Sequence, residues 1–306
     1  MATVSNLNGN IADSGFHVIP FASGWKCYFR AMASPCEILI GACPESEAQR
    51  LSLLAWTEVK RIEQKFSRYR DDNIIFEINT SQGKVIEIDE ETHRLLTFSD
   101  QCFQASEGLF DITSGVLRKA WAFHSNAVIP SQAEIEELLP LVGWQNVKWD
   151  ANSIQLKPMM ELDFGGIGKE YAADRALLLL TESHRQPYLV NLGGDIATNG
   201  ALFPEHEWRV GIEAISDKLV DNVLKVQEGA IATSGDSRRY LLSNGIRYSH
   251  ILNPQTGWPI KNAPHSMTIM ALSCVQAGML SSLALLQGQD AESFLDEMGI
   301  QYWSQR

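Results

Sequence analysis

Apolar residues recur at helical spacing over a long stretch near the start of the chain. After residue 50 they stand three or four positions apart, at Leu51, Leu54, Ala55, Val59, Ile62 and Phe66. Just before this run, Ser46 and Gln49 have the three-residue spacing of a capping box. The pattern therefore predicts a long amphipathic helix that begins near Ser46.

Capping residues mark further helices. Asp89 predicts the start of a second helix, and Ser131 with Glu134 has the spacing of a capping box for a short one. A glycine-rich turn and the apolar C-terminal region predict three more helices, over residues 168–181, 274–287 and 290–298.

Alternating apolar and polar residues predict strands over 26–30 and 37–41, joined by a turn at Ser34-Pro35. Four more strands are predicted, over residues 187–192, 207–213, 246–252 and 266–272. Strands mixed with long helices, without regular β-α-β alternation, favour an α+β fold with mixed or antiparallel strands over a doubly wound sheet. No repeat or linker is visible, so we expect a flexible N-terminal tail over residues 1–20 and one compact unit over residues 21–306.

Composition narrows the class of protein. The chain has 306 residues, of which 45% are hydrophobic and 20% charged, as in an ordinary soluble globular protein. Its formal net charge of −12 argues against a nucleic-acid surface, which needs clustered Lys and Arg. Any phosphate site must therefore rest on backbone amides, a metal or a few local cations.

The cysteines and the N-terminal residues bear on location. Five scattered cysteines without a C-x-x-C spacing support neither a disulfide framework nor a zinc site. The first 20 residues lack the basic and apolar regions of a secretory signal, and no stretch reaches the roughly 18 apolar residues of a membrane span. We therefore expect a cytoplasmic protein without a membrane span.

Several short stretches place glycines beside acidic or hydroxyl side chains at the end of an apolar run. They are Leu162 to Glu170, Asn191 to Ile196, Ala232 to Asp236, and the histidine-containing stretch from His250 to Gly257. Each one alone has the composition of an ordinary turn. Together they predict one large anionic small molecule, because glycines let the backbone amides approach a ligand closely.

The first of these stretches leads into a predicted helix. The turn with Gly165 and Gly166 is followed by Lys169, so a cation stands beside the unpaired amides of a helix N-terminus. The spacing fits neither a Walker loop nor a dinucleotide fingerprint. Taken alone, a plain strand-to-helix turn is the alternative.

In order and wording, these stretches resemble the FAD:protein FMN transferases of the ApbE family. The resemblance runs from about Ala31 to Gly288 and includes further blocks: Ala31-Met32-Ala33-Ser34-Pro35, Glu58-Val59, Ser67-Arg68-Tyr69, residues Phe110 to Leu117, and Trp121-Ala122-Phe123. It implies a T-fold-like α+β core. It also implies a Mg²⁺-dependent enzyme that cleaves FAD, attaches FMN by a phosphoester bond to a Thr or Ser of a target flavoprotein, and releases AMP.

The resemblance assigns roles to individual residues. Flavin or phosphate contacts are implied for Met32, Tyr69, Phe110, Asp111, Asp163, Lys169, Gly194, Asp195, Thr233, Ser234, Gly235, His250 and Leu252. His250 is also the candidate general base, because imidazole titrates near neutrality and can take a proton from the attacking hydroxyl. For Met32, Tyr69, Asp111 and Trp121 the alternatives are core side chains and a helix-starting Asp.

The metal positions depart from the family pattern. Gly166, Gly278 and Ser282 occupy them, but the family usually has Asp where Gly278 stands and Thr where Ser282 stands. Because a hard cation prefers carboxylate oxygen, another acid would have to fill in, and the candidates are Asp163, Asp195 and Asp236. The alternative functions are an FAD-binding module without transferase activity, and an Mg²⁺-dependent FAD pyrophosphatase.

Overall fold

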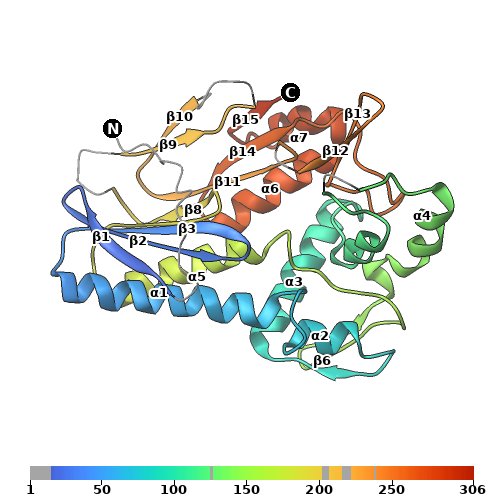
Figure 1. The fold of residues 1–306 in the computed structure, drawn as a ribbon, viewed down its shortest axis with the longest axis horizontal. Helices are drawn as coiled ribbons and strands as arrows, with labels where there is room; N and C mark the ends of the chain where they lie inside the picture. Colours follow the sequence, from blue (N-terminus) through green and yellow to red (C-terminus); the bar gives the residue numbers. More distant parts are fainter. Residues whose placement is uncertain (1–14, 125–126, 202–206, 216–221, 238) are drawn as a thin grey trace.

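An eight-stranded antiparallel sheet forms the centre of the fold (Figure 1). This computed structural model describes residues 15–124, 127–201, 207–215, 222–237 and 239–306. The strand order is β1-β2-β3-β7-β8-β11-β14-β15. The bounds of these strands are His17–Phe21, Gly24–Ala31, Ser34–Ile40, Tyr188–Leu192, Asp195–Thr198, Gly229–Gly235, Ser266–Ala271 and Tyr302–Gln305.

Side-chain alternation along the strands gives the sheet two apolar faces. Leu39, Leu189 and Ile231 face the hairpin of β9 (Trp208–Ile212) and β10 (Asn222–Val226), with which they form one buried cluster. Their neighbours on the same strands, such as Ile38 and Val190, belong to the larger core on the opposite face. Both faces are therefore covered within the described part of the chain.

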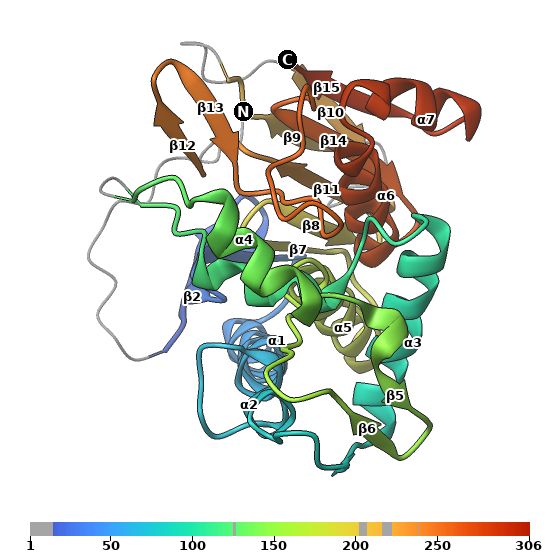
Figure 2. The same ribbon diagram turned by 90° about the vertical axis from the view of Figure 1, so that its right-hand side faces the viewer.

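Three helices cover the face that carries the larger core. They are α1 (Glu45–Phe66), α5 (Gly168–Ser183) and α6 (Cys274–Leu286). Figure 2 shows α1 and α5 side by side beneath the sheet, and α6 packs against α5 and against strands β11 and β14. Helix α7 (Ala291–Glu297) follows α6 and packs against it.

The residues between α1 and α5 lie beside the large sheet (Figure 1). They form the helices α2 (Ile74–Asn79), α3 (Glu90–Ala105) and α4 (Gln132–Leu138), and the 3₁₀ segments η1 (Ile112–Lys119), η2 (Leu139–Leu141) and η3 (Trp144–Asn146). A small antiparallel sheet completes this region, in the order β4 (Ile86–Glu87), β6 (Ser153–Gln155), β5 (Lys148–Trp149).

The α+β prediction is confirmed, and two of the predicted helix starts are confirmed in detail. Asp89 caps α3 by accepting from the Thr92 amide, and Ser131 with Glu134 forms a complete capping box on α4. The capping box predicted at Ser46 and Gln49 is wrong. Helix α1 begins at Glu45 after Pro44, whose φ of −59° already suits a helix entry without a side-chain cap.

Strand β1 begins the sheet earlier than the sequence pattern indicated. His17–Phe21 pairs with β2, so residues 17–20 of the predicted tail form part of the sheet, while residues 1–14 lie outside the described residues. The turn between β2 and β3 is also shifted, from Ser34-Pro35 to Met32 and Ala33. Both of these residues have positive φ, as the tightest hairpin turns require.

The predicted strand over 246–252 is shorter and belongs to a hairpin. Strand β12 (Tyr240–Ser243) pairs with β13 (Ile246–Ser249), and Gly245, with a φ of 76°, lies in the turn between them. Thr233, Ser234 and Gly235 were expected in a turn but form the end of β11, paired with β14. An apolar run that ends in small hydroxyl residues does not reveal where the strand stops.

None of the helices in the described ranges has the length and apolar character needed to cross a membrane. All five cysteines are free thiols. Burial raises the pKa of Cys27, Cys36 and Cys102 to about 12, so these thiols stay protonated near neutral pH.

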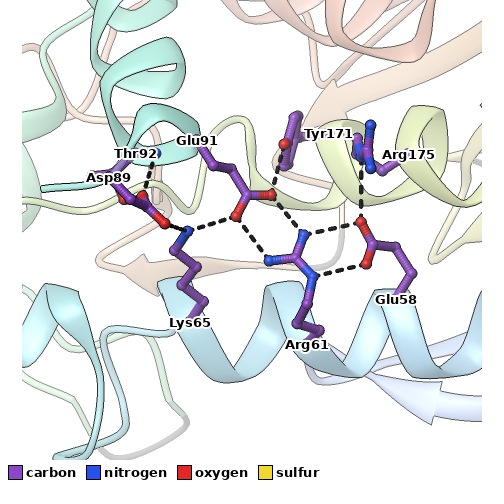
Figure 3. A network of polar contacts seen from close by, with 8 residues as sticks. All are labelled: Glu58, Arg61, Lys65, Asp89, Glu91, Thr92, Tyr171 and Arg175. Atoms are coloured by element: carbon purple, nitrogen blue, oxygen red, sulfur yellow. Dashed lines mark hydrogen bonds and ion pairs between the residues drawn. The ribbon is translucent and has the colours of Figure 1, made fainter. Parts of the chain in front are cut away.

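A network of charged side chains ties α1 to α3 and α5 (Figure 3). Arg61 of α1 pairs with Glu58 on the same helix and with Glu91 of α3, and Tyr171 of α5 donates to Glu91. Burial alone would raise the pKa of Glu91, but Arg61, Lys65 and Tyr171 hold it at about 2. Because folding lowers the pKa of Glu91, its carboxylate stabilises the folded protein at pH values above the pKa that it has in the unfolded chain. This contribution is lost as the pH falls towards 2.

Arg61→Ala is expected to lower the free energy of unfolding by about 2 kcal/mol, because it leaves two partly buried carboxylates without their shared cation. The midpoint of urea unfolding measures this change. The matched control on the same helix is Arg50→Ala, which removes a more exposed i,i+3 pair with Glu47 and should leave the midpoint almost unchanged. Equal losses in the two variants would contradict a role for the network in joining the helices.

Candidate active site

Two of the glycine-rich stretches meet where α5 begins. Lys169 in its first turn forms an ion pair with Asp195, the first residue of β8. Gly193 and Gly194 make the turn before β8 with φ of 70° and 105°, and the Gly194 amide donates to the Asn191 side chain at 2.9 Å. Glycine is required here because other residues are strained in this conformation.

The N-terminus of α5 has no side-chain cap. Its N-cap residue is Ile167, whose side chain cannot accept a hydrogen bond from the first amides of the helix. Burial disfavours the Lys169 ammonium, but the Asp195 and Glu170 carboxylates outweigh it and raise the pKa of Lys169 above its usual value. A fixed positive charge therefore stands in the first turn of a helix, where the helix dipole is also positive, an arrangement suited to a phosphate.

Glu170 follows Lys169 in the first turn of α5, and the sequence interpretation gave it no role. Its side chain is buried, with the residue 6% exposed, and its Oε2 has no hydrogen-bond partner. Burial, followed by the nearby charge of Asp195, raises the pKa of Glu170 to about 8. A usable signal was present, because helical spacing places Glu170 on the same face as the buried Ala173 and Ala176.

Hydroxyl side chains connect the end of β11 to α6. Ser234 Oγ lies 2.7 Å from Ser281 Oγ and 3.0 Å from Ser282 Oγ, and Thr233 Oγ1 lies 2.8 Å from Thr268 Oγ1. The Ser281 hydroxyl also donates to the Gly278 carbonyl at 3.0 Å. Ser282 thus lies among hydroxyl oxygens that could bind a cation. Gly278 has no side chain, and its carbonyl oxygen already accepts a hydrogen bond from Ser281.

Asp163 and Tyr69 are linked through Arg68, a residue to which no role was assigned from the sequence. Arg68 forms an ion pair with Asp163 and donates to the Tyr69 hydroxyl at 2.8 Å, with its guanidinium 4.9 Å from the Tyr69 ring centre. The second Asp163 oxygen accepts from the Gly165 amide at 2.9 Å. Tyr69 is 77% exposed and presents a flat aromatic face.

Phe110 lies against the turn that contains Gly166, and Asp111 is the next residue in the chain. A side chain at Gly166 would stand 3.4 Å from the Phe110 ring, so the glycine and the ring are direct neighbours. The Asp111 carboxylate accepts from Thr113 at the start of η1, and from the Trp144 amide at 2.9 Å. Asp111 therefore caps the start of η1, as one of its two interpretations expected. Its contact with a flavin stays a prediction.

Met32 lies in the β2–β3 turn with a φ of 50°, and its amide donates to Glu63 of α1. Trp121 is buried, stacks on Phe123, and donates to the Gly257 carbonyl at 2.8 Å. Trp121 is therefore a core side chain, which was the alternative to a flavin contact. Its hydrogen bond to Gly257 fixes the turn that follows His250.

His250 follows directly after β13. Its Nδ1 lies 2.9 Å from the Arg239 carbonyl oxygen, and its ring meets Phe123 edge-on at 6.2 Å. Because a carbonyl oxygen only accepts, this contact assigns the proton to Nδ1 and leaves the Nε2 lone pair available. Burial, and then the charge of Arg239, lowers the pKa of His250 below 6.5, so the ring is neutral at pH 7.

Leu252 pairs in an isolated antiparallel bridge with Pro259 and packs in a small apolar cluster with Trp121. A pocket of about 250 Å³ lies on the other side of this segment, lined in part by Ser249 and Ile251. Asp236, also in its lining, is held by Arg247 at 2.8 Å and His265 at 2.9 Å. Its carboxylate is thus already occupied by two cationic or potentially cationic groups.

The predicted residues form three local groups. The first group surrounds the N-terminus of α5 and the end of β11, and consists of Lys169, Gly194, Asp195, Thr233, Ser234, Gly278 and Ser282. The second group surrounds the turn before α5, and consists of Tyr69, Phe110, Asp111, Asp163 and Gly166. The third group follows β13, and consists of His250 and Leu252. Gly235, at the end of β11, approaches the His265 backbone so closely that a side chain would clash. Among the described residues no three His, Cys, Asp or Glu side chains are arranged to hold a metal ion, so a cation here would use hydroxyl and carbonyl oxygens as well.

Comparison with known proteins identifies the class. Residues 32–303 match the family model of the ApbE family, and the chain belongs to this family. A FAD:protein FMN transferase of Vibrio cholerae is 28% identical over 245 residues, which are 76% of this chain and 73% of that protein.

Solved structures agree with this assignment. The ApbE protein of Thermotoga maritima superposes with a TM-score of 0.83 at 28% identity, over 95% of this chain and 94% of that one. The apo form of the Pseudomonas stutzeri flavinyl transferase ApbE gives a TM-score of 0.81 at 25% identity, over 94% of this chain and 91% of that one. The fold is therefore that of the family.

Proposed function

We propose that this chain is an FAD:protein FMN transferase, which cleaves the FAD pyrophosphate and joins FMN through its phosphate to a Thr or Ser hydroxyl of a target flavoprotein. One observation carries the proposal: the N-terminus of α5, the Lys169 ammonium and the hydroxyl groups at the end of β11 lie close together. In a chain of net charge −12, this is a local site for a phosphate-bearing substrate.

His250 would act as the general base. Its Nδ1 is fixed on the Arg239 carbonyl, so Nε2 would accept the proton of the attacking hydroxyl as the new phosphorus–oxygen bond forms and AMP leaves. Lys169 and the α5 amides would stabilise the charge that develops on the phosphate oxygens. Tyr69 would offer its exposed ring as a wall for the flavin or the adenine.

Oxygen atoms before and within the first turn of α5, at the end of β11 and on α6 would suit a magnesium ion. Ser282 and Ser234 would offer hydroxyl oxygens and Gly166 a backbone carbonyl, and Oε2 of Glu170 is a buried carboxyl oxygen without a hydrogen-bond partner. A bound Mg²⁺ would polarise the bridging phosphate oxygens. We propose that the transferase unit comprises residues 21–306 together with β1. It would act in the cytoplasm, and its partner would be a flavoprotein that carries the acceptor hydroxyl.

The test is to incubate the protein with FAD, Mg²⁺ and an acceptor flavoprotein, and to follow in-gel flavin fluorescence of the denatured acceptor. We expect covalent flavin on the acceptor, and none on a version whose acceptor Thr is replaced by Val. Release of AMP and free FMN without labelling would favour the pyrophosphatase. Tight FAD binding without any turnover would favour the binding module.

A further inference from the structure

The space beside Gly278 is filled by the side chain of Glu170. A Cβ atom built on Gly278 would stand 2.6 Å from Glu170 Cγ and 2.8 Å from its Oε1. Real Cβ atoms do not approach other atoms so closely, so a larger residue at 278 and the observed Glu170 position exclude each other. The carboxylate of α5 therefore occupies the place where a side chain of α6 would begin.

Glu170 also differs from the other acids of the site in its partners. Asp163 is paired with Arg68, Asp195 with Lys169, and Asp236 with Arg247 and His265. These are the three acids that the sequence offered as substitutes for a missing carboxylate.

By contrast, Oε2 of Glu170 has no hydrogen-bond partner, although the residue is only 6% exposed. A buried carboxyl oxygen without any hydrogen-bond partner is costly to keep, and such an atom calls for an explanation by an unseen ligand or ion. The hydroxyl cluster of Ser281 and Ser282 lies on the next turn of α6 after Gly278. A cation near Ser282 would therefore find its carboxylate ligand on α5.

We propose that Glu170 is the carboxylate ligand of the divalent cation in this protein, taking over from α6 the role that Gly278 cannot perform. This inference rests on the proposed function for the identity of the site. It makes the Glu170 and Gly278 positions interdependent, since an acid on α6 requires a small residue on α5.

The test measures metal binding rather than turnover. Mn²⁺ is titrated into the FAD-bound protein, and free Mn²⁺ is followed by electron paramagnetic resonance. Glu170→Gln keeps the shape of the side chain and should weaken Mn²⁺ binding by about tenfold or more, the scale expected when an oxygen ligand loses its charge. Gly278→Asp alone should also bind poorly, because its side chain clashes with Glu170.

The double variant Glu170→Ala with Gly278→Asp should bind Mn²⁺ more tightly than either the Gln variant or the single Asp variant. It removes the clash and returns a carboxylate to α6. This recovery would not occur if Glu170 only filled space in the core. Circular dichroism and thermal melting establish that each variant is folded.

The matched control is Asp174→Asn, one turn further along α5. Asp174 is also packed against α6, but its carboxylate accepts from the Cys274 and Val275 amides at 2.8 and 3.0 Å. Its replacement should leave Mn²⁺ affinity within about twofold, because it is a helix cap and not a ligand.

Unchanged Mn²⁺ affinity in Glu170→Gln, or no Mn²⁺ binding by the wild-type FAD complex, would overturn the inference. Flavin transfer is measured in parallel with the same preparations. If wild type transfers flavin while Glu170→Gln keeps its Mn²⁺ affinity, the inference fails and the transferase stands. If Mn²⁺ binding depends on Glu170 but no transfer occurs, the ligand assignment stands and the proposed function fails.

Discussion

Replacing His250 with alanine is expected to lower the rate of flavin transfer by about 10²–10⁴, the usual contribution of a positioned general base. FAD affinity should change by less than about tenfold, because a base directed at the attacking hydroxyl contributes little to holding the dinucleotide. Single-turnover transfer and FAD titration by fluorescence quenching separate the two quantities. The neutral ring with its proton on Nδ1 is the structural reason for this expectation.

The pH dependence provides an independent readout of the same role. Because burial and the charge of Arg239 lower the pKa of His250, the neutral base predominates at pH 7 and persists to lower pH than in a free imidazole. The transfer rate should therefore fall only as the pH drops through a value below 6.5. In His250→Ala this acid limb should disappear together with most of the rate.

Asp163→Ala is the contrasting variant. Asp163 orients Arg68 beside Tyr69 and accepts from the Gly165 amide, so its loss should weaken FAD binding itself. If His250→Ala abolished FAD binding while Asp163→Ala left it intact, both assignments would be wrong. The histidine would then have to be placed against the flavin.

Lys169→Met is expected to lower both FAD affinity and stability. It strands Asp195, which is 3% exposed, beside a second buried acid, and breaking such a pair costs about 3 kcal/mol. It also removes the cation at the α5 N-terminus, so FAD affinity should fall by at least about tenfold, the effect of roughly 1.4 kcal/mol. Urea unfolding and FAD titration measure the two effects.

The double variant Lys169→Met with Asp195→Asn distinguishes the two causes. Removing the stranded charge should restore most of the stability, because a buried pair replaced as a whole is far less costly than a broken one. FAD affinity should stay weak, since the cation is still missing. Recovery of both quantities together would show that Lys169 supports the fold and does not contact phosphate.

The regular elements could be predicted because their signals are local. Asp89 and Ser131 act on amides three residues away, so the sequence alone locates the starts of α3 and α4. Pro44 shifted the start of α1 through a backbone preference that the capping pattern did not include. The hairpin of β12 and β13 was missed because its first strand has little apolar alternation.

The site could be predicted only in outline, because its partners are distant in the sequence. The glycine-rich turns and Lys169 are visible as short motifs, but the pairing of Lys169 with Asp195 depends on how α5 meets β8. Glu170 and Gly278 stand 108 positions apart by their numbers, and only the packing of α5 on α6 shows that one fills the space of the other. Arg68 was likewise visible as a residue, but its link to Asp163 was not.

The most direct measurement of the central claim is the ratio of AMP released to FMN covalently bound, with purified protein, FAD, Mg²⁺ and an acceptor flavoprotein. AMP is quantified by chromatography and the modified acceptor by intact mass. A transferase in which the acceptor hydroxyl attacks the FMN phosphate gives one AMP for each FMN attached, with no free FMN. AMP accompanied by free FMN and an unmodified acceptor, or no AMP at all, would contradict the account.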